Sequence, residues 1–461
     1  MMSPLESMIL DRNCESLGIP VSTLMDNAGV ALFDIVSKEF AGKKILIVCG
    51  IGNNGGDGFA CAKRFGRKAD VAVLFPSDRI KTDAAKRQYN LLRKRPAMFT
   101  DVSVNEYDVI IDCGLGIGGR PPLDDVYIKY FEVLKKFKGT IVSADVPTGF
   151  GTDDHLIPDI TVTFHDMKEG MNEKNCGRII IADIGIPEEA SRFVGPGDML
   201  RYPVPKKDSH KGDNGRLLVI GGGPYIGAPA MSAMAAFRVG SDLVRIATPR
   251  LSFDHIASMT PAFIMHRTSD DILTENDVPR LLELSEKVDA VLIGPGLGTD
   301  ERTMAAVREF MDRCKKPMTV DADGITAISS VPRIPDNVVI TPHHKEFEIF
   351  SAGSGDPVAD VSEHRNVTIL IKGRIDTIAQ WENIRMNRAG TPAMTVGGTG
   401  DVLSGIVAGL LSKGMSTYDA ACLGAFICGT AGEKAFSKKS YGMIATDVID
   451  MIPKVLKEHL R

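Results

Sequence analysis

Apolar runs of mainly Val, Ile and Leu recur along the whole chain, and stretches with helical periodicity separate many of them. Continuous apolar runs are typical of strands buried on both faces, and their alternation with helices predicts an α/β protein with parallel sheets. The expected strands are residues 43–49, 70–75, 107–112, 139–145, 160–164, 178–183, 216–222, 242–248, 289–294, 317–323, 337–341 and 366–373.

The two halves of the chain repeat this theme on either side of an irregular segment. Residues 195–215 are poor in periodic apolar residues and rich in Pro, Gly and charge, which predicts a domain boundary. We therefore expect two domains, residues 1–200 and 201–461. The halves share no motif, which argues against an internal repeat. Ahead of the first strand, residues 22–40 show helical periodicity, with Ser22 as the expected N-cap.

Composition and charge exclude several classes of function. The chain has 461 residues, a formal net charge of −5 and no basic run, which argues against nucleic acids and membranes as partners. It shows neither an apolar stretch of about 18 residues nor the pattern of a signal peptide. Its eight cysteines form no CxxC pair, as expected of reduced thiols. We expect a cytoplasmic enzyme, and a homo-oligomer because closed oligomers are common among such enzymes.

A glycine-rich segment with polar residues follows the first expected strand. The stretch GIGNNGGDG, residues 50–58, contains Asn53, Asn54 and Asp57, and a helix is expected from about Phe59. Glycines permit close approach of a ligand to the backbone, and the positive end of the helix favours an anion. The alternative is a plain tight turn between strand and helix, which requires fewer polar residues than this stretch contains.

Two further strands of the first half end at carboxylates. Asp112 precedes a second glycine loop at residues 116–122, and Asp145 precedes a turn that contains Thr148. Open parallel sheets bind ligands at the carboxyl ends of their strands. Together, the three strand ends predict a site for an anionic ligand or a cation.

The second half places small and acidic residues at similar points. Residues 225–240 predict a helix of small residues suited to close packing, and residues 292–298 carry a strand into a glycine turn. Asp321 and Asp323 follow another strand. An acidic pair there suits magnesium or hydroxyl groups, although ordinary helix capping explains it equally well.

Later strand ends carry histidine and lysine. His343 and His344 lack a third metal ligand at a recognised spacing, so we interpret His343 as a polar contact to substrate. Lys372 and Gly373 follow a strand at a place suited to nucleotide phosphates. No GxxxxGK[ST] motif is present, which excludes a P-loop NTPase.

The stretch TVGGTGDVLSG, residues 395–405, joins a bare loop to a helix expected from about Asp401. Free backbone N–H groups at a helix start stabilise a transferring phosphoryl group, and a carboxylate beside them can accept a proton from the attacking hydroxyl group. We interpret Asp401 as this base. The alternative is a capping aspartate behind a flexible turn.

The motifs of the first half resemble the epimerase domain of bifunctional NAD(P)H-hydrate repair enzymes. The resemblance implies a Rossmann-like three-layer sandwich, a potassium ion at Asn54, Asp112 and Thr148, and proton transfer by Asp145 or Lys168. Oxygen ligands of this kind suit a hard cation, whereas a lone lysine such as Lys168 is as often a solvated surface charge. The residues implied to bind the hydrated nucleotide are Asn53, Asn54, Gly55, Gly56, Asp57, Gly116, Ile117, Gly118, Gly119, Arg120, Pro121, Pro122 and Asp145.

The order IGG, YxGAP, GPGLG, DAD, TPH, KG and GGTGD in the second half resembles the dehydratase domain of the same family. It implies a ribokinase-like fold, with magnesium and ADP; bacterial and archaeal members use ADP, and eukaryotic members use ATP. Ser241 and Asp242 depart from the family's small residues, with an expected effect on packing. The implied hydrate contacts are Ala228, Gly296, His343 and Asp401, and the implied nucleotide contacts are Lys372, Gly373, Arg374, Ile375, Asp376 and Gly400.

The function implied by the resemblance is repair of NADHX and NADPHX, the hydrates of NADH and NADPH. The first domain would interconvert their R and S epimers. The second would dehydrate the S form using ADP, which yields AMP and phosphate. The alternative is a kinase for a sugar or vitamin alcohol with a non-catalytic N-terminal module, and the family-like N-terminal motifs argue against it.

Overall fold

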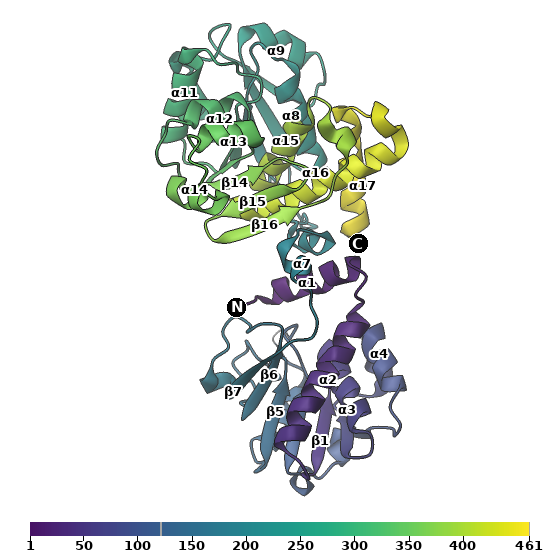
Figure 1. The fold of residues 1–461 in the computed structure, drawn as a ribbon. Helices are drawn as coiled ribbons and strands as arrows, with labels where there is room; N and C mark the ends of the chain where they lie inside the picture. Colours follow the sequence, from purple (N-terminus) through teal and green to yellow (C-terminus); the bar gives the residue numbers. More distant parts are fainter. Residues whose placement is uncertain (120–121, 461) are drawn as a thin grey trace. The chain divides into compact units, whose positions relative to one another are not determined.

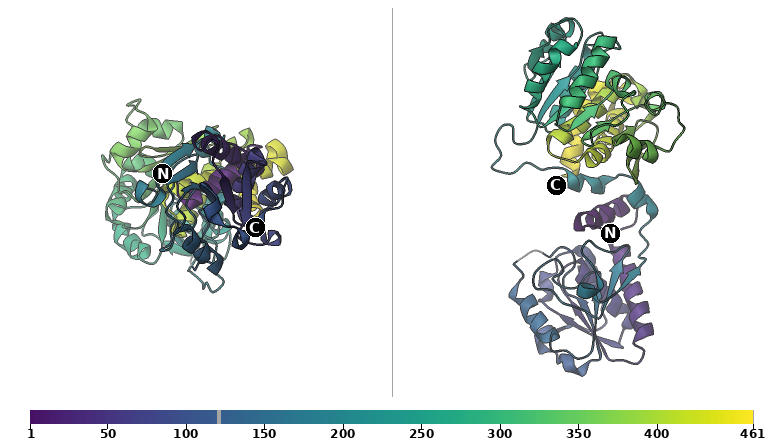
Figure 2. Two further views of the ribbon diagram at one scale, coloured as in Figure 1. Left: turned by 90° about the horizontal axis from the view of Figure 1, so that it is seen from below. Right: turned by 90° about the vertical axis from the view of Figure 1, so that its left-hand side faces the viewer.

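The computed structural model describes residues 1–119 and 122–460. Its internal contacts divide the chain into two compact units, Met1–Ala190 and Ser191–Arg461, which are described separately (Figure 1). Each unit contains one large sheet with helices on both faces (Figure 2).

The sheet of the first unit has the order β3-β2-β1-β4-β5-β6-β7, and every neighbouring pair is parallel. The chain therefore reverses its direction of winding between β1 and β4, where doubly wound sheets form a crevice. The strands are β1 Ile45–Cys49, β2 Ala69–Val73, β3 Ala97–Met98, β4 Val109–Cys113, β5 Thr140–Ala144, β6 Ile160–Phe164 and β7 Arg178–Ala182.

Alternate residues of these strands face two different hydrophobic layers. In β1, Ile45, Ile47 and Cys49 pack with the helices α2 and α3, whereas Leu46 and Val48 pack with α5. A strand buried on both faces needs apolar residues at every position, which explains its continuous apolar sequence. The helices that begin in this unit are α1 Pro4–Ser16, α2 Val21–Glu39, α3 Asn53–Phe65, α4 Asp83–Asn90, α5 Asp125–Leu134, α6 Glu173–Cys176 and α7 Glu188–Arg192, with 3₁₀ turns at Ser77–Arg79, Phe99–Asp101 and Val104–Glu106.

The sheet of the second unit has the order β10-β9-β8-β11-β12-β13-β14-β15-β16. It is parallel from β10 to β14 and ends in the antiparallel strands β15 and β16. The strands are β8 Arg216–Ile220, β9 Leu243–Thr248, β10 Ile264–Arg267, β11 Ala290–Ile293, β12 Met318–Val320, β13 Val338–Ile340, β14 Thr368–Ile371, β15 Asp376–Gln380 and β16 Asn383–Asn387.

Two hydrophobic layers also enclose this sheet. One contains α8, α15, α16 and α17, and the other contains α10, α11 and α12. A Cβ at Gly405 of α15 would lie 2.2 Å from the Ser232 carbonyl oxygen of α8, so the small residues allow these helices to touch. The helices are α8 Gly227–Arg238, α9 Arg250–Ala257, α10 Val278–Ser285, α11 Glu301–Arg313, α12 Asp323–Ile328, α13 His344–Phe350, α14 Val358–Arg365, α15 Thr399–Ser412, α16 Thr417–Lys439 and α17 Ala445–His459, with 3₁₀ turns at Pro196–Arg201, Glu275–Asp277, Pro392–Thr395 and Ser440–Gly442.

Every strand expected from the sequence is present, but four others were not expected. Strand β3 has two residues, β10 includes His266 and Arg267, and β15 and β16 form a hairpin with polar positions. Short or edge strands need no continuous apolar run, so hydrophobicity does not reveal them.

Two expected helix starts are wrong, and a third differs by two residues. Helix α2 has Pro20 rather than Ser22 at its N-cap, without a side-chain hydrogen bond. Helix α3 begins at Asn53, not near Phe59, because its glycines accommodate the neighbouring backbone within the first turns. Helix α15 begins at Thr399 with Gly398 as the N-cap, at φ 95°, so Asp401 lies within the first turn and is not the cap.

Residues 191–200 pack with the second unit. The Val194 N–H group donates to the Met386 carbonyl oxygen at 2.8 Å. Arg385 of β16 donates to the Phe193 carbonyl oxygen at 2.8 Å and forms an ion pair with Asp198, which is fully buried. The structural division therefore lies before the boundary expected at residue 200, and the functional boundary stays a prediction.

No single helix of the described residues is long and apolar enough to cross a membrane, and α1 with α2 meets that criterion only as a pair bent by 116°.

Candidate functional site

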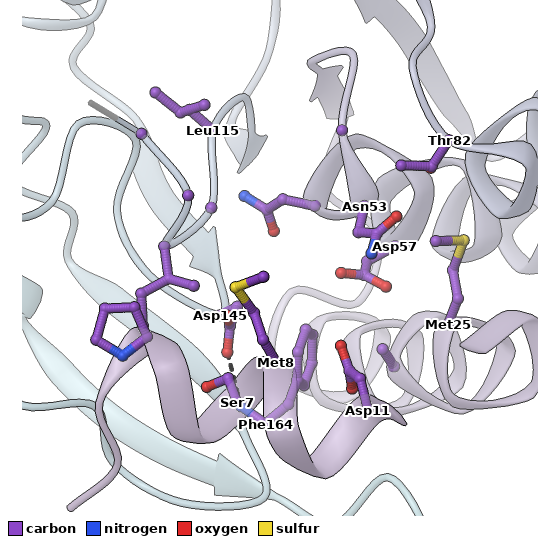
Figure 3. A pocket seen from close by; sticks show the side chains of 18 of the residues that line it. Ser7, Met8, Asp11, Met25, Asn53, Asp57, Thr82, Leu115, Asp145 and Phe164 are labelled. Carbon is purple, nitrogen blue, oxygen red and sulfur yellow. Dashed lines mark hydrogen bonds between the residues drawn. The ribbon is translucent and has the colours of Figure 1, made fainter. Parts of the chain in front are cut away.

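The first unit contains a cavity of about 680 Å³ at the carboxyl ends of its central strands. It lies next to the change of direction between β1 and β4, as expected for an open parallel sheet. The N-terminus of α3 borders the cavity through Asn53, Asn54 and Asp57 (Figure 3). Unpaired N–H groups at a helix start favour an anionic ligand at this place.

The glycines of this segment allow neighbouring parts of the chain to approach closely. A Cβ at Gly55 would lie 2.2 Å from the Gly50 carbonyl oxygen, and one at Gly56 would lie 2.6 Å from Met25 Cε. Both glycines are buried and are not part of the cavity lining. Their absence of side chains allows the helix to begin directly behind β1.

A second wall of the cavity comes from the loop after β4. Gly116, Ile117, Gly118, Gly119 and Pro122 line it. The expected contacts Arg120 and Pro121 lie outside the described residues.

Asp112 is fully buried at the end of β4 and is surrounded by hydrogen-bond donors. The Tyr130 and Ser143 hydroxyl groups donate to it at 3.0 and 2.9 Å. The Thr148 hydroxyl group and N–H group donate at 2.6 and 3.0 Å, and the Gly114 N–H group at 3.2 Å. These bonds compensate the burial of the carboxylate and connect β4 to the turn after β5.

Asn54 differs from Asp112, because neither its amide nitrogen nor its amide oxygen has a hydrogen-bond partner although both are buried. A buried unsatisfied carbonyl oxygen is costly unless an ion or water occupies the space beside it. The oxygen atoms of Asn54, Thr148 and Asp112 are ligands of the type that an alkali cation accepts. The residues present therefore fit such an ion, with Asn54 supplying the free oxygen.

Asp145 and Lys168 form an ion pair with a distance of 2.7 Å between Oδ1 and Nζ. The Lys168 ammonium group also donates to Thr163 Oγ1 and to the carbonyl oxygens of Phe164 and Asp166, at 3.1, 2.7 and 3.1 Å. Lys168 is buried, so it is not a solvated surface charge. Asp145 has a φ of 62°, a strained conformation of the kind found at functional sites.

Asp11 and Asp57 border the same cavity, and Asp11 on α1 was not expected from the sequence. Burial raises the pKa of Asp11 to about 6, and Asp145 adds to this rise while Lys168 opposes it. Burial also raises the pKa of Asp57 well above its ordinary value, and Asp145 and Asp11 add to that effect. The helical spacing of Pro4, Ser7 and Asp11 is the signal that points to one common face of α1.

The second unit gathers its motifs at one edge of its sheet. Lys372, after β14, pairs with Asp321, after β12, with 2.9 Å between Nζ and Oδ1. A Cβ at Gly400, in the first turn of α15, would lie 3.3 Å from Lys372 Nζ. Burial raises the pKa of Asp401 to about 7; Asp321 and Asp323 also raise it, and Lys372 lowers it.

Asp321 and Asp323 have different partners. Asp323 accepts a hydrogen bond from the Gly298 N–H group at 2.8 Å, so it holds the glycine turn after β11. The residue between them, Ala322, is the N-cap of α12 at φ 49° and makes no side-chain cap. Helix capping therefore does not explain the acidic pair.

Gly296 occupies a position that requires glycine. Its φ is 70°, and a Cβ there would lie 2.2 Å from the Tyr225 carbonyl oxygen. The turn after β11 therefore lies against the segment that leads into α8. Ala228, in the first turn of α8, is partly exposed.

His343 caps α13. Its Nδ1 atom accepts from the Glu346 N–H group at 3.2 Å, and its own N–H group donates to Glu346 Oε2 at 2.8 Å. The side chain is 54% exposed, and its Nε2 atom lies 3.6 Å from Glu346 Oε1. Capping of α13 is therefore a role of His343 that was not predicted from the sequence.

The loop between β14 and β15 is held by hydrogen bonds to Asp376, the first residue of β15, and three of its residues are exposed. Asp376 accepts from the Gly373 N–H group at 3.0 Å and from Asn387 Nδ2 at 2.9 Å. Gly373, Arg374 and Ile375 are exposed. Asp376 therefore shapes the loop, while its neighbours face solvent.

Among residues 1–119 and 122–460, no three His, Cys, Asp or Glu side chains are grouped to hold a metal ion. The eight cysteines are buried and free of disulfides.

Two sequence families match the two units. The family described as NAD(P)H-hydrate dehydratase matches residues 217–454, and that described as YjeF-related protein N-terminus matches residues 21–170. The bifunctional NAD(P)H-hydrate repair enzyme of Methanothermobacter thermautotrophicus is 36% identical over 494 residues, which cover 99% of this chain and 95% of that protein. The chain belongs to the family of bifunctional NAD(P)H-hydrate repair enzymes.

Solved structures agree with the fold of the family's C-terminal domain. A ribokinase-like superfamily protein from Enterococcus faecalis matches with a TM-score of 0.52 and 25% identity, and covers 58% of this chain and 96% of its own. The ADP/ATP-dependent NAD(P)H-hydrate dehydratase from Bacillus subtilis, co-crystallized with ATP and Mg²⁺, matches with a TM-score of 0.50 and 24% identity, over 58% of this chain and 99% of its own. The second unit is therefore ribokinase-like, and the sheet of the first is Rossmann-like.

The two family models cover most of both sites, but neither includes α1. Asp145, Lys168 and Asn54 lie within the N-terminal match, and Asp401 lies within the C-terminal match. Asp11 precedes residue 21, where the N-terminal match begins.

Proposed function

We propose that the protein repairs the hydrates of NADH and NADPH in two reactions. The first unit interconverts the R and S epimers, and the second dehydrates the S form using ADP, which yields AMP and phosphate. The observation that carries the proposal is the meeting of Lys372, Asp321 and the first turn of α15 at one edge of a ribokinase-like sheet. The relative from Methanothermobacter thermautotrophicus is named a bifunctional NAD(P)H-hydrate repair enzyme, and the match covers 99% of this chain and 95% of that protein.

The second unit's residues suit phosphoryl transfer to a hydroxyl group. Asp401 accepts the hydroxyl proton as the hydroxyl oxygen attacks the terminal phosphorus, and the phosphorus–oxygen bond to the leaving nucleotide breaks. The N–H groups at the start of α15 and the Lys372 ammonium group stabilise the phosphoryl oxygens. Loss of phosphate and one ring proton then restores the dihydropyridine.

The remaining contacts follow from the family resemblance. We propose that Ala228, Gly296 and His343 contact the hydrate beside Asp401. Residues 372–376 and Gly400 contact the adenine nucleotide, with Asp376 acting through the loop that it shapes. Magnesium, which the Bacillus subtilis structure contains with ATP, would neutralise charge on the nucleotide's phosphates.

In the first unit, the hydrate lies in the cavity between the start of α3 and residues 116–122. Asn53, Asp57 and the backbone of the glycine segment orient the nucleotide. Asp145 handles the proton that moves when the hydroxyl-bearing carbon is inverted, and Lys168 holds Asp145 in place and supports its negative charge. Lys168 is buried, whereas 19% of the Asp145 side chain is exposed and Asp145 borders the cavity, so its carboxylate can reach the ligand.

A potassium ion should bind at Asn54 with Asp112 and Thr148 beside it. The unsatisfied Asn54 oxygen supports this proposal, and the ion would shape the cavity wall. In crystals grown with potassium, we expect density with oxygen neighbours at about 2.7–3.0 Å, longer than the roughly 2.1 Å of Mg²⁺. Crystals grown with rubidium should give an anomalous peak at the same point, and sodium crystals are the control. A hydrogen-bonded water there in potassium and rubidium crystals contradicts the site.

The phosphate donor should be ADP. Purified S hydrate, magnesium and the full-length protein should restore dihydronicotinamide absorbance much faster with ADP than with ATP, as expected for bacterial and archaeal members of the family. Equal or faster restoration with ATP contradicts this prediction. If neither nucleotide restores absorbance, while a sugar or vitamin alcohol is phosphorylated, the dehydratase proposal itself is wrong.

Three properties complete the proposal. We propose that the functional domains are residues 1–200 and 201–461, that the enzyme works in the cytoplasm, and that it forms a homo-oligomer. Expression of residues 1–200 alone, followed by an epimerase assay without nucleotide, tests the first of these.

A further inference from the structure

Helix α1 forms a wall of the first unit's cavity, although it precedes the part of the chain that matches the N-terminal family. Pro4, Ser7, Met8 and Asp11 line the cavity with helical spacing, and Figure 3 shows the last three on the same helix. One face of α1 is thus turned to the ligand space.

Both ends of α1 are fixed to the first unit. The Met2 N–H group donates to the Met167 carbonyl oxygen at 2.8 Å, and the Glu169 N–H group donates to the Met2 carbonyl oxygen at 3.0 Å. At the other end, Asn13 Nδ2 donates to the Ala190 carbonyl oxygen at 3.1 Å. The two hydrogen bonds of Met2 lie on either side of Lys168 in the sequence, so they fix the position of α1 relative to this buried lysine.

Near α1, more acidic than basic side chains border the cavity. Asp11, Asp57 and Asp145 border it with Lys168, and Lys168 is paired with Asp145. Within the described residues, the carboxyl groups of Asp11 and Asp57 make no hydrogen bond or ion pair. Figure 3 shows these two side chains facing the same space.

The remaining charged groups of the described lining reduce this excess of negative charge but do not remove it. Asp124 is within 3.9 Å of Arg79, and Lys81 and His165 also border the cavity. Glu15, on α1 itself, adds negative charge near Asp11. Three ionised carboxylates beside one lysine repel one another, and the nucleotide's own phosphates would add to the repulsion.

We propose that Asp11 and Asp57 hold one proton between them and deliver it to the hydroxyl group that leaves the hydrated ring. This rests on the epimerase activity proposed above and assigns its acid. Acid catalysis at neutral pH needs a carboxyl group that stays protonated. Burial raises the pKa of Asp57 well above its ordinary value, and the neighbouring carboxylates of Asp145 and Asp11 add to this rise, which agrees with this role. Asp145, held by Lys168, is then the base.

The reaction balances without another reactant. The carbon–oxygen bond breaks as the hydroxyl group takes the proton and leaves as water, and the lone pair of the ring nitrogen forms a carbon–nitrogen double bond. Water adds to the opposite face of the planar carbon and gives its proton to Asp145. Solvent returns that proton to the Asp11–Asp57 pair, so the enzyme is unchanged.

The test measures epimerisation by the full-length protein from about pH 5 to about pH 9, without nucleotide, for the wild type and four variants. Asp57→Asn should lower the rate by about 10²-fold or more at every pH. Asp11→Asn removes a neighbouring negative charge, so Asp57 should lose its proton at lower pH. The alkaline decline of the rate should therefore begin about one pH unit earlier than in the wild type. Asp11→Glu should restore the wild-type profile.

Asp124→Asn is the matched control, because Asp124 also borders the cavity but caps α5 beside Arg79, and asparagine can cap equally well. It should keep the wild-type profile. An Asp11→Asn profile parallel to the wild type, whether equal or uniformly lower, overturns the proposal and leaves α1 a structural role. A wild-type protein without epimerase activity would instead refute the proposed function on which it rests.

Discussion

Asp401→Asn should lower the dehydratase rate by about 10²-fold or more. Asparagine has nearly the same shape but cannot accept the proton of the attacking hydroxyl group. The measurement is the ADP-dependent return of dihydronicotinamide absorbance at saturating S hydrate. Epimerisation by the same variant should be unchanged, because Asp145 and Lys168 belong to the first unit.

The same variant should remain folded. Asp401 is not the N-cap of α15, so the substitution keeps the cap. It removes the attraction of the carboxylate to the helix dipole and to Lys372 and also its repulsion from Asp321 and Asp323, so the net cost should be at most about 1 kcal/mol. Asp419→Asn, in the first turn of α16, is the matched control and should keep full activity. Repair within a few-fold of the wild type by Asp401→Asn would show that Asp401 is not the base.

The pH profile gives a second check on Asp401. A base must be deprotonated to act, and burial raises the pKa of Asp401 to about 7. The wild-type dehydratase rate should therefore rise with pH through about 7 and level off above it. A rate that falls over this range would contradict the assignment.

Asp145→Asn should lower the epimerase rate by about 10²- to 10⁴-fold. It removes the proposed base and leaves the ammonium group of Lys168 buried without its counter-charge. Purified R hydrate, followed by chromatographic separation of the epimers, gives the rate. Dehydration of purified S hydrate by the same variant should be unaffected.

Breaking a buried ion pair is itself destabilising, by about 3–5 kcal/mol, so folding must be measured separately. Thermal unfolding of Asp145→Asn should show a weakened first unit, and Asp145→Asn with Lys168→Met should recover stability without recovering activity. Asp26→Asn breaks a more exposed pair with Lys63 and should leave epimerisation unchanged. Near wild-type epimerisation by the folded double variant would exclude both Asp145 and Lys168 from proton transfer.

The sequence predicted the strands of both sheets because strands buried on two faces must be apolar throughout. Strand β1 shows this directly, since its residues fill two different hydrophobic layers. Strands β15 and β16 were not predicted, because buried and exposed positions mix along them and they form no continuous apolar run. Helix α3 shows a similar limit, because a glycine run can be a loop or the first turn of a helix until its neighbours are known.

For the site, the sequence by itself determined which strand ends carry carboxylates and glycines, because parallel strands bring their carboxyl ends to one edge of a sheet. Asp112 and Asp145 were predicted on this basis, and Asp401 was predicted from the glycine-rich loop that leads into its helix. Only the tertiary structure decided that Lys168 is buried against Asp145, that Lys372 pairs with Asp321, and that α1 brings Asp11 to the same cavity. These contacts join residues far apart in the chain, and the protonation of each group depends on burial and neighbouring charge, which no local pattern contains.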